Sequence, residues 1–249
     1  MNFFRYQLLL LSLATGMESF GQDATTIVRN ADERMKGKTS YAVISIRTER
    51  PTYSRELELE AWTIGDSLSL IKILSPARDK GTVFLRRNKE AWNWLPSIER
   101  TIKMPPSMMS QSWMGTDFTN DDLVKEASIV KDYTHRLMGT ELMEGLNCFR
   151  LELIPRPEAA VVWGKILLWI DRNDYMLLRA EYYDEEGALV NTMIGSDIGK
   201  LGGRTLPRRM QMIPAKKTGN KTVLSYRSLQ FDQPLDPNRF TPQQLQLQR

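Results

Sequence analysis

The 249-residue sequence contains only one cysteine, Cys148, and only one histidine, His135. A single cysteine cannot form an intrachain disulfide, and these two residues are too few to supply most zinc sites. Redox chemistry based on a cysteine pair is excluded for the same reason. Cys148 lies in the run "LNCFRLELI", where we expect a small buried packing residue rather than a nucleophile.

Long apolar runs are also scarce. The apolar run at residues 8–13 is well short of the roughly 20 residues that span a bilayer. It follows Arg5, and Ser19 and Gly21 suit the small-residue positions before a cleavage site. These features predict a cleavable signal peptide at residues 1–21 and one domain at residues 22–249, with an uncleaved anchor as the alternative.

Motifs for catalysis or for metal and cofactor binding are absent as well. Ser69 and Lys72 have the Ser-x-x-Lys spacing of an acylating serine, but a strand would point them to opposite faces. His135 has no nucleophile elbow to pair with, and no helix follows "GKLGG", as phosphate binding requires. The acidic run "GTDFTNDD" lacks calcium-loop spacing and suits helix capping. We therefore expect no catalytic residue, no metal and no cofactor.

The charge balance is basic, with a net charge of +4 and a pI near 9.1. Nucleic acid is not an expected partner for a secreted protein. The basic residues near the end of the chain suit either solvated strand faces or a patch for anionic lipid headgroups or an acidic partner. They are Arg204, Arg208, Arg209, Lys216, Lys217 and Lys221.

The period of the apolar residues changes once, at Gly37. Residues 23–35 have helical spacing, with Asp23 as a suitable N-cap. After Gly37, short segments with period-two alternation or β-branched residues recur between turn signals. These segments are 41–50, 55–62, 66–75, 81–87, 90–95, 99–104, 133–142, 146–154, 161–171, 175–183, 188–197, 204–213 and 221–231.

The sequence therefore predicts a mainly β protein with a few helices (α+β). A sheet of this size must curl or close to hide its edges. We expect a half-open antiparallel barrel of about eleven strands, with the N-terminal helix and a helical insertion at its mouth. Short helices are expected at residues 119–130 and 236–247. Residues 161–171 are apolar on both faces, so this strand should be covered on both sides.

One segment has neither the helical period nor the period of two that is typical of strands. It contains "MPPSMMSQSWMG", residues 104–115, and methionine suits surfaces that fit varied apolar shapes. Composition leaves two interpretations open, a packed plug in the core or the wall of a pocket for alkyl chains. The candidate lipid-binding residues are Trp92, Trp94, Leu95, Met104, Met108, Met109, Trp113, Met114 and Phe118.

Several of these runs together resemble the LolA-like family of outer-membrane lipoprotein-sorting proteins. They are "SPARDKGTVFL", "AWNWLPSIERTIKMPPSMMSQSWMGTDFTNDDL", "ILLWIDRNDYMLLRAEYYDEEGALV" and "LPRRM", in the family's order. The resemblance is strongest to the branch associated with resistance-nodulation-type lipid exporters, and it covers roughly residues 40–240. Two features differ from the family. The loop before "MGTDF" is Met- and Pro-rich here, and the arginine that latches the lid in the best-known carriers cannot be placed.

The resemblance implies a half-open barrel whose helices cover an apolar cavity. It also implies a monomeric, non-enzymatic carrier in the periplasm of a Gram-negative bacterium. The carrier would take acyl chains of a lipoprotein or lipid from an inner-membrane transporter, of resistance-nodulation or ABC type, to an outer-membrane acceptor. The alternative is an adaptor of an envelope export complex, with a filled barrel and no cavity. A third possibility, an enzyme acting on lipid or peptidoglycan, lacks a candidate set of residues.

Overall fold

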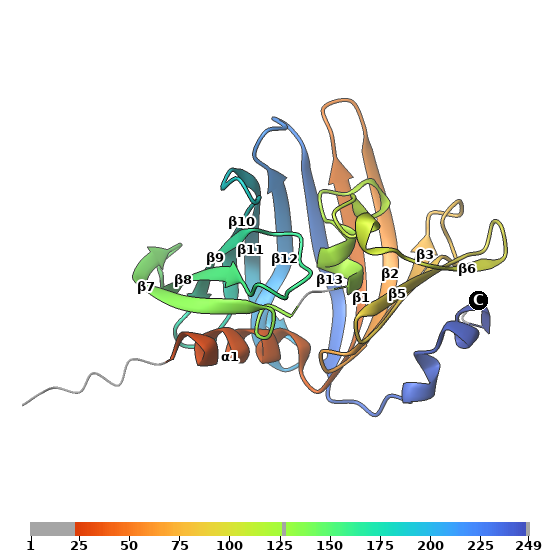
Figure 1. The fold of residues 1–249 in the computed structure, drawn as a ribbon, viewed down its shortest axis with the longest axis horizontal. Helices are drawn as coiled ribbons and strands as arrows, with labels where there is room; N and C mark the ends of the chain where they lie inside the picture. The colour runs from red at the N-terminus through yellow and green to blue at the C-terminus, as the bar shows by residue number, and fades with distance from the viewer. Residues whose placement is uncertain (1–22, 126–127, 248–249) are drawn as a thin grey trace, which may run out of the picture.

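The structure, a computed structural model, describes residues 23–125 and 128–247, so the predicted signal peptide lies outside the described residues. In this part of the chain, thirteen strands form one antiparallel sheet (Figure 1). The strands are β1 Thr39–Glu49, β2 Ser54–Ile64, β3 Leu68–Ser75, β4 Val83–Arg87, β5 Glu90–Leu95, β6 Arg100–Lys103, β7 Tyr133–Met143, β8 Leu146–Pro155, β9 Lys165–Asp171, β10 Leu177–Tyr183, β11 Leu189–Leu201, β12 Arg204–Pro214 and β13 Lys221–Phe231. All thirteen predicted segments are therefore confirmed as strands. The expected barrel had about eleven strands, whereas the observed sheet has thirteen. The short β6 is one of them, since all four of its residues pair with β5.

The sheet consists of two meanders joined at its centre. β1 to β6 follow one another on one side, β7 to β13 on the other, and β1 pairs with β13. The two edges are β6 and β7, and the sheet curls without closing into a barrel. The segment between these strands, described at residues 104–125 and 128–132, lies between one free edge and the other. It crosses the open side of the sheet, over β13 and β1 (Figure 1).

Alternation along the strands builds the main core on the concave face. In β1 and β2, Ala42 lies opposite Ala61, Ile44 opposite Leu59, and Ile46 opposite Leu57. All six contribute to the main apolar cluster. The glutamates between them in β2 point to the other face, where Glu60 accepts a 2.6 Å hydrogen bond from the Tyr41 hydroxyl. This bond and partial burial raise the pKa of Tyr41 to about 12.

The N-terminal helix forms as predicted, as α1 Ala24–Lys36. The side chain of Asp23 accepts a hydrogen bond from the backbone N–H of Thr26, which satisfies a donor left free at the helix start. Gly37 ends the helix at a φ of 63°, a conformation that glycine adopts without steric cost. Ile27, Val28 and Ala31 are buried, so α1 packs against one end of the sheet, where it contacts β7 and β9 (Figure 1).

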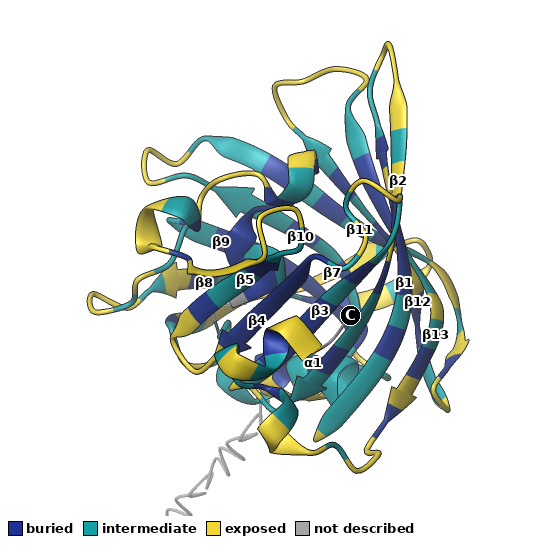
Figure 2. Ribbon diagram, turned by 90° about the vertical axis from the view of Figure 1, so that its right-hand side faces the viewer, coloured by how far each residue is buried: buried dark blue, intermediate teal, exposed yellow. Residues whose placement is uncertain are grey.

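Two smaller apolar clusters cover parts of the convex face, while the hairpin tips are exposed (Figure 2). In the first, Phe240 and Leu245 of the C-terminal segment pack over Trp62, Leu70 and Trp94. In the second, Leu167 and Trp169 of β9 pack with Cys148, Met176 and Leu178. The alternate residues of β9, Ile166, Leu168 and Ile170, face the main core. Burial of β9 on both faces is thus confirmed.

The two short predicted helices differ from expectation. The first predicted helix, residues 119–130, falls partly outside the described residues, and its described part contains a π-helical turn, η3 Asp121–Lys125. Residues 236–247 form two 3₁₀ turns, η4 Pro237–Arg239 and η5 Pro242–Leu247. Pro242 explains the break, because proline has no N–H to continue a helix begun at residue 237. In the part of the chain that is described, no helix is long and apolar enough to cross a membrane.

Candidate functional site

An apolar cavity of about 320 Å³ lies on the concave face of the sheet. α1 borders it at one end, and Phe118 and Leu123 of the segment between β6 and β7 border it on the open side. This volume is at the lower end of the range for ligand pockets, roughly 300–1,000 Å³. The sheet contributes mostly aliphatic side chains, namely Ala42, Ile44, Ala61, Ile166, Leu168, Ile170, Leu177, Leu224 and Leu229.

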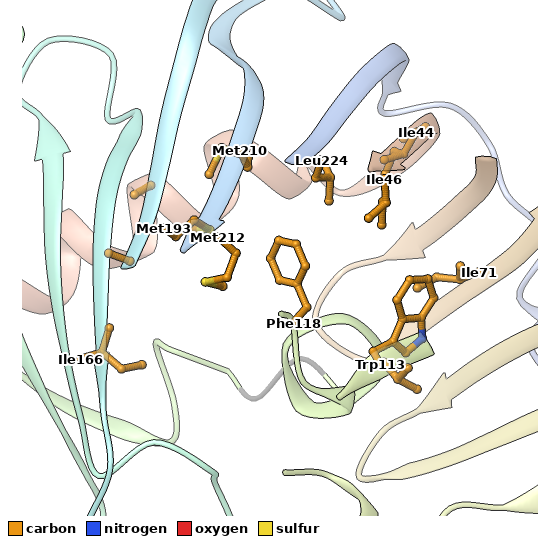
Figure 3. Packing of buried hydrophobic residues seen from close by; sticks show 14 of the residues in the cluster. Ile44, Ile46, Ile71, Trp113, Phe118, Ile166, Met193, Met210, Met212 and Leu224 are labelled. Carbon is orange, nitrogen blue, oxygen red and sulfur yellow. The ribbon is translucent and has the colours of Figure 1, made fainter. Parts of the chain in front are cut away.

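Four methionines also line this cavity: Met35 of α1, Met193 of β11, and Met210 and Met212 of β12. In β12 the methionines alternate with exposed or half-buried polar residues, and Met193 pairs directly with Met212 across the ladder. Figure 3 shows Met193, Met210 and Met212 together on one side of the Phe118 ring. The strand register thus gathers flexible thioether side chains at one wall of the cavity.

One end of the apolar cavity is polar. Asp121, Asp122, Tyr133 and Tyr182 border it there. Asp122 accepts a 2.9 Å hydrogen bond from the indole Nε1 of Trp163 and a 2.8 Å bond from the backbone N–H of Thr119. Burial nonetheless raises the pKa of the Asp122 carboxyl, and it also raises the pKa of the Tyr182 hydroxyl. The hydrogen bonds of Asp122 tie the segment after β6 to the loop before β9.

The Met-rich segment, residues 104–118, is a compact folded loop. Trp113 is fully buried, and its ring lies 5.4 Å from that of Phe84 on β4. Backbone hydrogen bonds join Trp113 N–H to Phe118 O at 2.8 Å and Asp121 N–H to Met109 O at 3.0 Å. The predicted cap is present, because the Thr119 hydroxyl accepts a hydrogen bond from Asp122 N–H while the Asp122 carboxylate accepts one from Thr119 N–H.

Arg50 and Asp117 fasten this segment to the sheet. The guanidinium of Arg50 makes two contacts with the Asp117 carboxylate, at 2.9 and 3.1 Å, and both side chains are nearly buried. The hydroxyl of Thr222, on β13, donates a 2.7 Å hydrogen bond to the same carboxylate. Arg55 of β2 adds a 3.1 Å hydrogen bond to the carbonyl of Met114. The segment is therefore held to β13, to β2 and to the turn between β1 and β2.

The structure separates the nine candidate lipid-binding residues. Phe118 lines the apolar cavity. Met104, Met109 and Trp113 are buried in the main core, and Met108 and Met114 pack half-buried against it. Trp92 and Trp94 belong to the convex-face cluster under the C-terminal segment. Leu95 is half-buried at the end of β5. Their assignment as lipid-binding residues stays a prediction.

The predicted basic patch is likewise divided. At one end of β12, Arg204 donates hydrogen bonds to the carbonyls of Glu33 and Arg34 at the end of α1, and pairs with Asp232. Further along the strand, Arg208 pairs with Asp197, and Arg209 is exposed. Lys216 and Lys217 are exposed in the turn after β12. Lys221, at the start of β13, pairs with Glu49.

The surroundings of Cys148, His135, Ser69 and Lys72 do not assemble a catalytic group. Burial raises the pKa of the Cys148 thiol to about 11, which disfavours the reactive thiolate. His135 contacts the Thr25 hydroxyl and the Ile129 carbonyl, at 3.1 and 2.7 Å. Ser69 and Lys72 point to opposite faces of β3, since Ile71 lies in the main core and Leu70 in the convex-face cluster. Residues 23–125 and 128–247 contain no group of three His, Cys, Asp or Glu side chains that could hold a metal ion.

The sequence interpretation missed the methionines that line the cavity. The alternation in "RRMQMI", residues 208–213, marks Met210 and Met212 as one face of a strand. It does not reveal that Met193 lies across from Met212, nor that α1 leaves space above them. Arg50 was also missed as a fastening residue, since the sequence marks it only as part of the Arg50-Pro51 turn.

Comparison with known proteins identifies both a family and a set of similar folds. Residues 65–247 match a family model described as an uncharacterized protein. A DUF1329 family protein from Desulfovibrio piger superposes with a TM-score of 0.80, at 22% identity over 89% of this chain and 97% of that one. A putative outer membrane lipoprotein-sorting protein domain from Vibrio parahaemolyticus gives a TM-score of 0.77, at 23% identity over 90% and 100% of the two chains.

A LolA superfamily protein from Nitrosomonas europaea also gives a TM-score of 0.77, at 25% identity over 89% of this chain and 98% of that one. Among curated proteins, none matches. All three similar structures cover nearly the whole described chain, so the sheet, α1 and the segment that crosses the open side belong to a shared fold.

Proposed function

Since this chain belongs to the LolA-like family of outer-membrane lipoprotein-sorting proteins, we propose that it is a carrier of acyl chains. The carrier binds the chains of a lipoprotein or lipid in the apolar cavity and moves them through the periplasm from the inner toward the outer membrane. The observation that carries this proposal is the cavity itself, whose wall is mainly apolar and includes four methionines.

The size of the cavity suits part of an acyl chain. A methylene is comparable to a water molecule, which takes up roughly 30 Å³ in the liquid, so on the order of ten methylenes would fill the cavity. At about 0.8 kcal/mol for each buried methylene, the gross gain is about 8 kcal/mol. The cost of ordering both partners reduces this gain, which leaves an affinity that permits release at an acceptor.

In this proposal the segment between β6 and β7 acts as a lid. It crosses the open side of the sheet, and its Phe118 forms part of the cavity wall. Arg50 and Asp117 hold it in the closed position. A bound chain longer than the cavity requires the lid to shift, and the flexible methionines allow the opposite wall to adjust.

The adaptor hypothesis predicted a filled barrel. The core around Trp113 is indeed solidly packed, but the concave face next to it contains the cavity. Unfilled space in a core lowers the stability of a protein. A cavity without a ligand would therefore be a cost to an adaptor, with no function to offset it. This contrast favours the carrier over the adaptor.

The test fills the cavity with a side chain. Ala42 is a buried residue of β1 that lines the cavity, whereas Ala77 is exposed in a turn. We expect Ala42→Phe to weaken the binding of a fluorescent fatty acid by about tenfold or more, because the ring takes the space of several methylenes. Ala77→Phe, the matched control, should bind like the wild type.

Native mass spectrometry of wild-type protein purified from a bacterial periplasm gives the second measurement. The carrier proposal predicts a co-purifying lipid, which Ala42→Phe should lack. A wild-type protein that neither carries a lipid nor takes up the fluorescent fatty acid would contradict the proposal.

A further inference from the structure

A second hollow of about 730 Å³ adjoins the apolar cavity. It lies on the far side of the lid segment, between residues 110–119, the start of β11 and the turn after β12. Ten of its seventeen lining residues have polar or charged side chains, although most of the lining surface is apolar. We call this hollow the polar basin, and its polar lining residues include Ser110, Ser112, Thr116, Asn191, Lys216 and Lys217.

Phe118 and Trp163 line both hollows. The ring of Phe118 points toward the cavity side, near Met212 and Leu224 (Figure 3). The indole of Trp163 is fixed by its hydrogen bond to Asp122, at 2.9 Å. These two aromatic side chains therefore lie between the two hollows, and a basin bordered by charged and hydroxyl groups adjoins the apolar cavity.

Three cationic and two anionic side chains border the polar basin, which leaves one net positive charge. The charges of Arg50 and Asp117 neutralise each other in their ion pair. Asp184 accepts a 2.7 Å hydrogen bond from the N–H of Ala188 within its own turn. Lys216 and Lys217 are exposed, and neither has an ion pair within the described residues. Two lysines are thus available to a ligand.

We propose that the polar basin binds the phosphate of an anionic phospholipid whose acyl chain occupies the apolar cavity. This inference rests on the proposed carrier function and adds the chemical class of the cargo. The phosphate is placed between the ammonium groups of Lys216 and Lys217, where hydroxyls such as that of Ser110 also border the basin. The glycerol backbone passes from one hollow to the other at Phe118, next to the flexible Met212.

The experiment compares ligands that share their acyl chains and differ in the headgroup. Affinities are measured for short-chain phosphatidic acid, for diacylglycerol with the same chains, and for glycerol 3-phosphate. Each is tested with the wild type, with Lys216→Gln/Lys217→Gln, and with a control in which two exposed lysines outside the basin, Lys80 and Lys89, are replaced by Gln.

We expect the wild type to bind phosphatidic acid about tenfold more tightly than diacylglycerol, as two exposed charge contacts would give. The preference should disappear in Lys216→Gln/Lys217→Gln and persist in the control, while all three proteins bind diacylglycerol equally. It should also shrink as salt is added, because exposed charges are screened.

Two results would overturn the inference without touching the carrier proposal. One is equal binding of phosphatidic acid and diacylglycerol by the wild type. The other is a preference that survives in the double variant. If glycerol 3-phosphate binds as tightly as the lipid, the basin is a site for free phosphate esters and the headgroup assignment is wrong. If no lipid with acyl chains binds the wild type, the carrier proposal itself fails.

Discussion

Two groups of methionines occupy different parts of the same core. Met104, Met108, Met109 and Met114 lie within a dozen residues of each other in sequence, and all of them pack against solid core. Met35, Met193, Met210 and Met212 are scattered through the chain, and together they line the apolar cavity. The dense group belongs to a folded loop, whereas the scattered group is assembled by strand register.

The comparison shows that local density of flexible apolar residues is a poor guide to ligand contact. The loop needs apolar side chains to bury itself on the open side of the sheet, because its backbone has few long-range ladder bonds. The cavity wall borders an unfilled space that is enclosed by α1, the sheet and Phe118. The following tests separate a structural role for the first group from a binding role for the second.

The largest expected effect concerns the structural role of the Met-rich segment. Trp113→Ala should lower the free energy of unfolding by about 3–5 kcal/mol, because it removes a fully buried aromatic side chain. Trp92→Ala, at a half-buried position on the convex face, should cost only about 1–2 kcal/mol. Urea denaturation measures both, and equal losses would argue against a packed role for the segment.

The next effect concerns the fastening of the segment. Arg50→Met should cost about 2–3 kcal/mol, because Asp117 keeps a nearly buried charge without its main partner. Hydrogen exchange should speed up at residues 113–121. The matched control is Arg136→Met, which breaks an exposed ion pair with Glu152 and should cost under about 1 kcal/mol. Unchanged exchange in Arg50→Met would show that other contacts hold the segment.

A pair of identical substitutions tests the binding role directly. Met210→Gln places an amide in the apolar cavity and should weaken fatty-acid binding by about tenfold, which corresponds to roughly 1.4 kcal/mol. Met108→Gln makes the same change at a half-buried position of the Met-rich segment and should leave binding within about twofold. Fluorescence titration gives both values, and the reverse order would assign the lipid to the segment.

The smallest effect is a pH dependence at the polar end of the cavity. Burial raises the pKa of Asp122 in the folded state, so between about pH 4, the unfolded value, and the higher folded value the folded protein holds more protons. The contribution of Asp122 to stability must therefore fall as pH rises through this window. We expect wild type to lose more unfolding free energy than Asp122→Asn between about pH 4 and pH 7. A larger loss in the variant would contradict the assigned direction.

The sequence predicts the sheet better than it predicts the site. Each strand alternates or is bounded by turn residues, and Asp23 and Gly37 mark the ends of α1, so local patterns suffice for both. Phe118 is the one candidate binding residue found in the cavity wall. The other wall residues come from strands far apart in sequence, such as β1 and β11. Their meeting depends on how the sheet curls and where α1 rests, and no local pattern encodes either.

Photo-crosslinking tests the central claim most directly. A fatty acid with a diazirine near its chain end is bound to the wild-type protein, irradiated, and the adducts are mapped by peptide mass spectrometry. The carrier account predicts adducts on the cavity wall, at α1 and in β11 and β12 around Met193, Met210 and Met212. Adducts confined to residues 104–114 would place the lipid at the Met-rich segment, outside the cavity, and contradict the account.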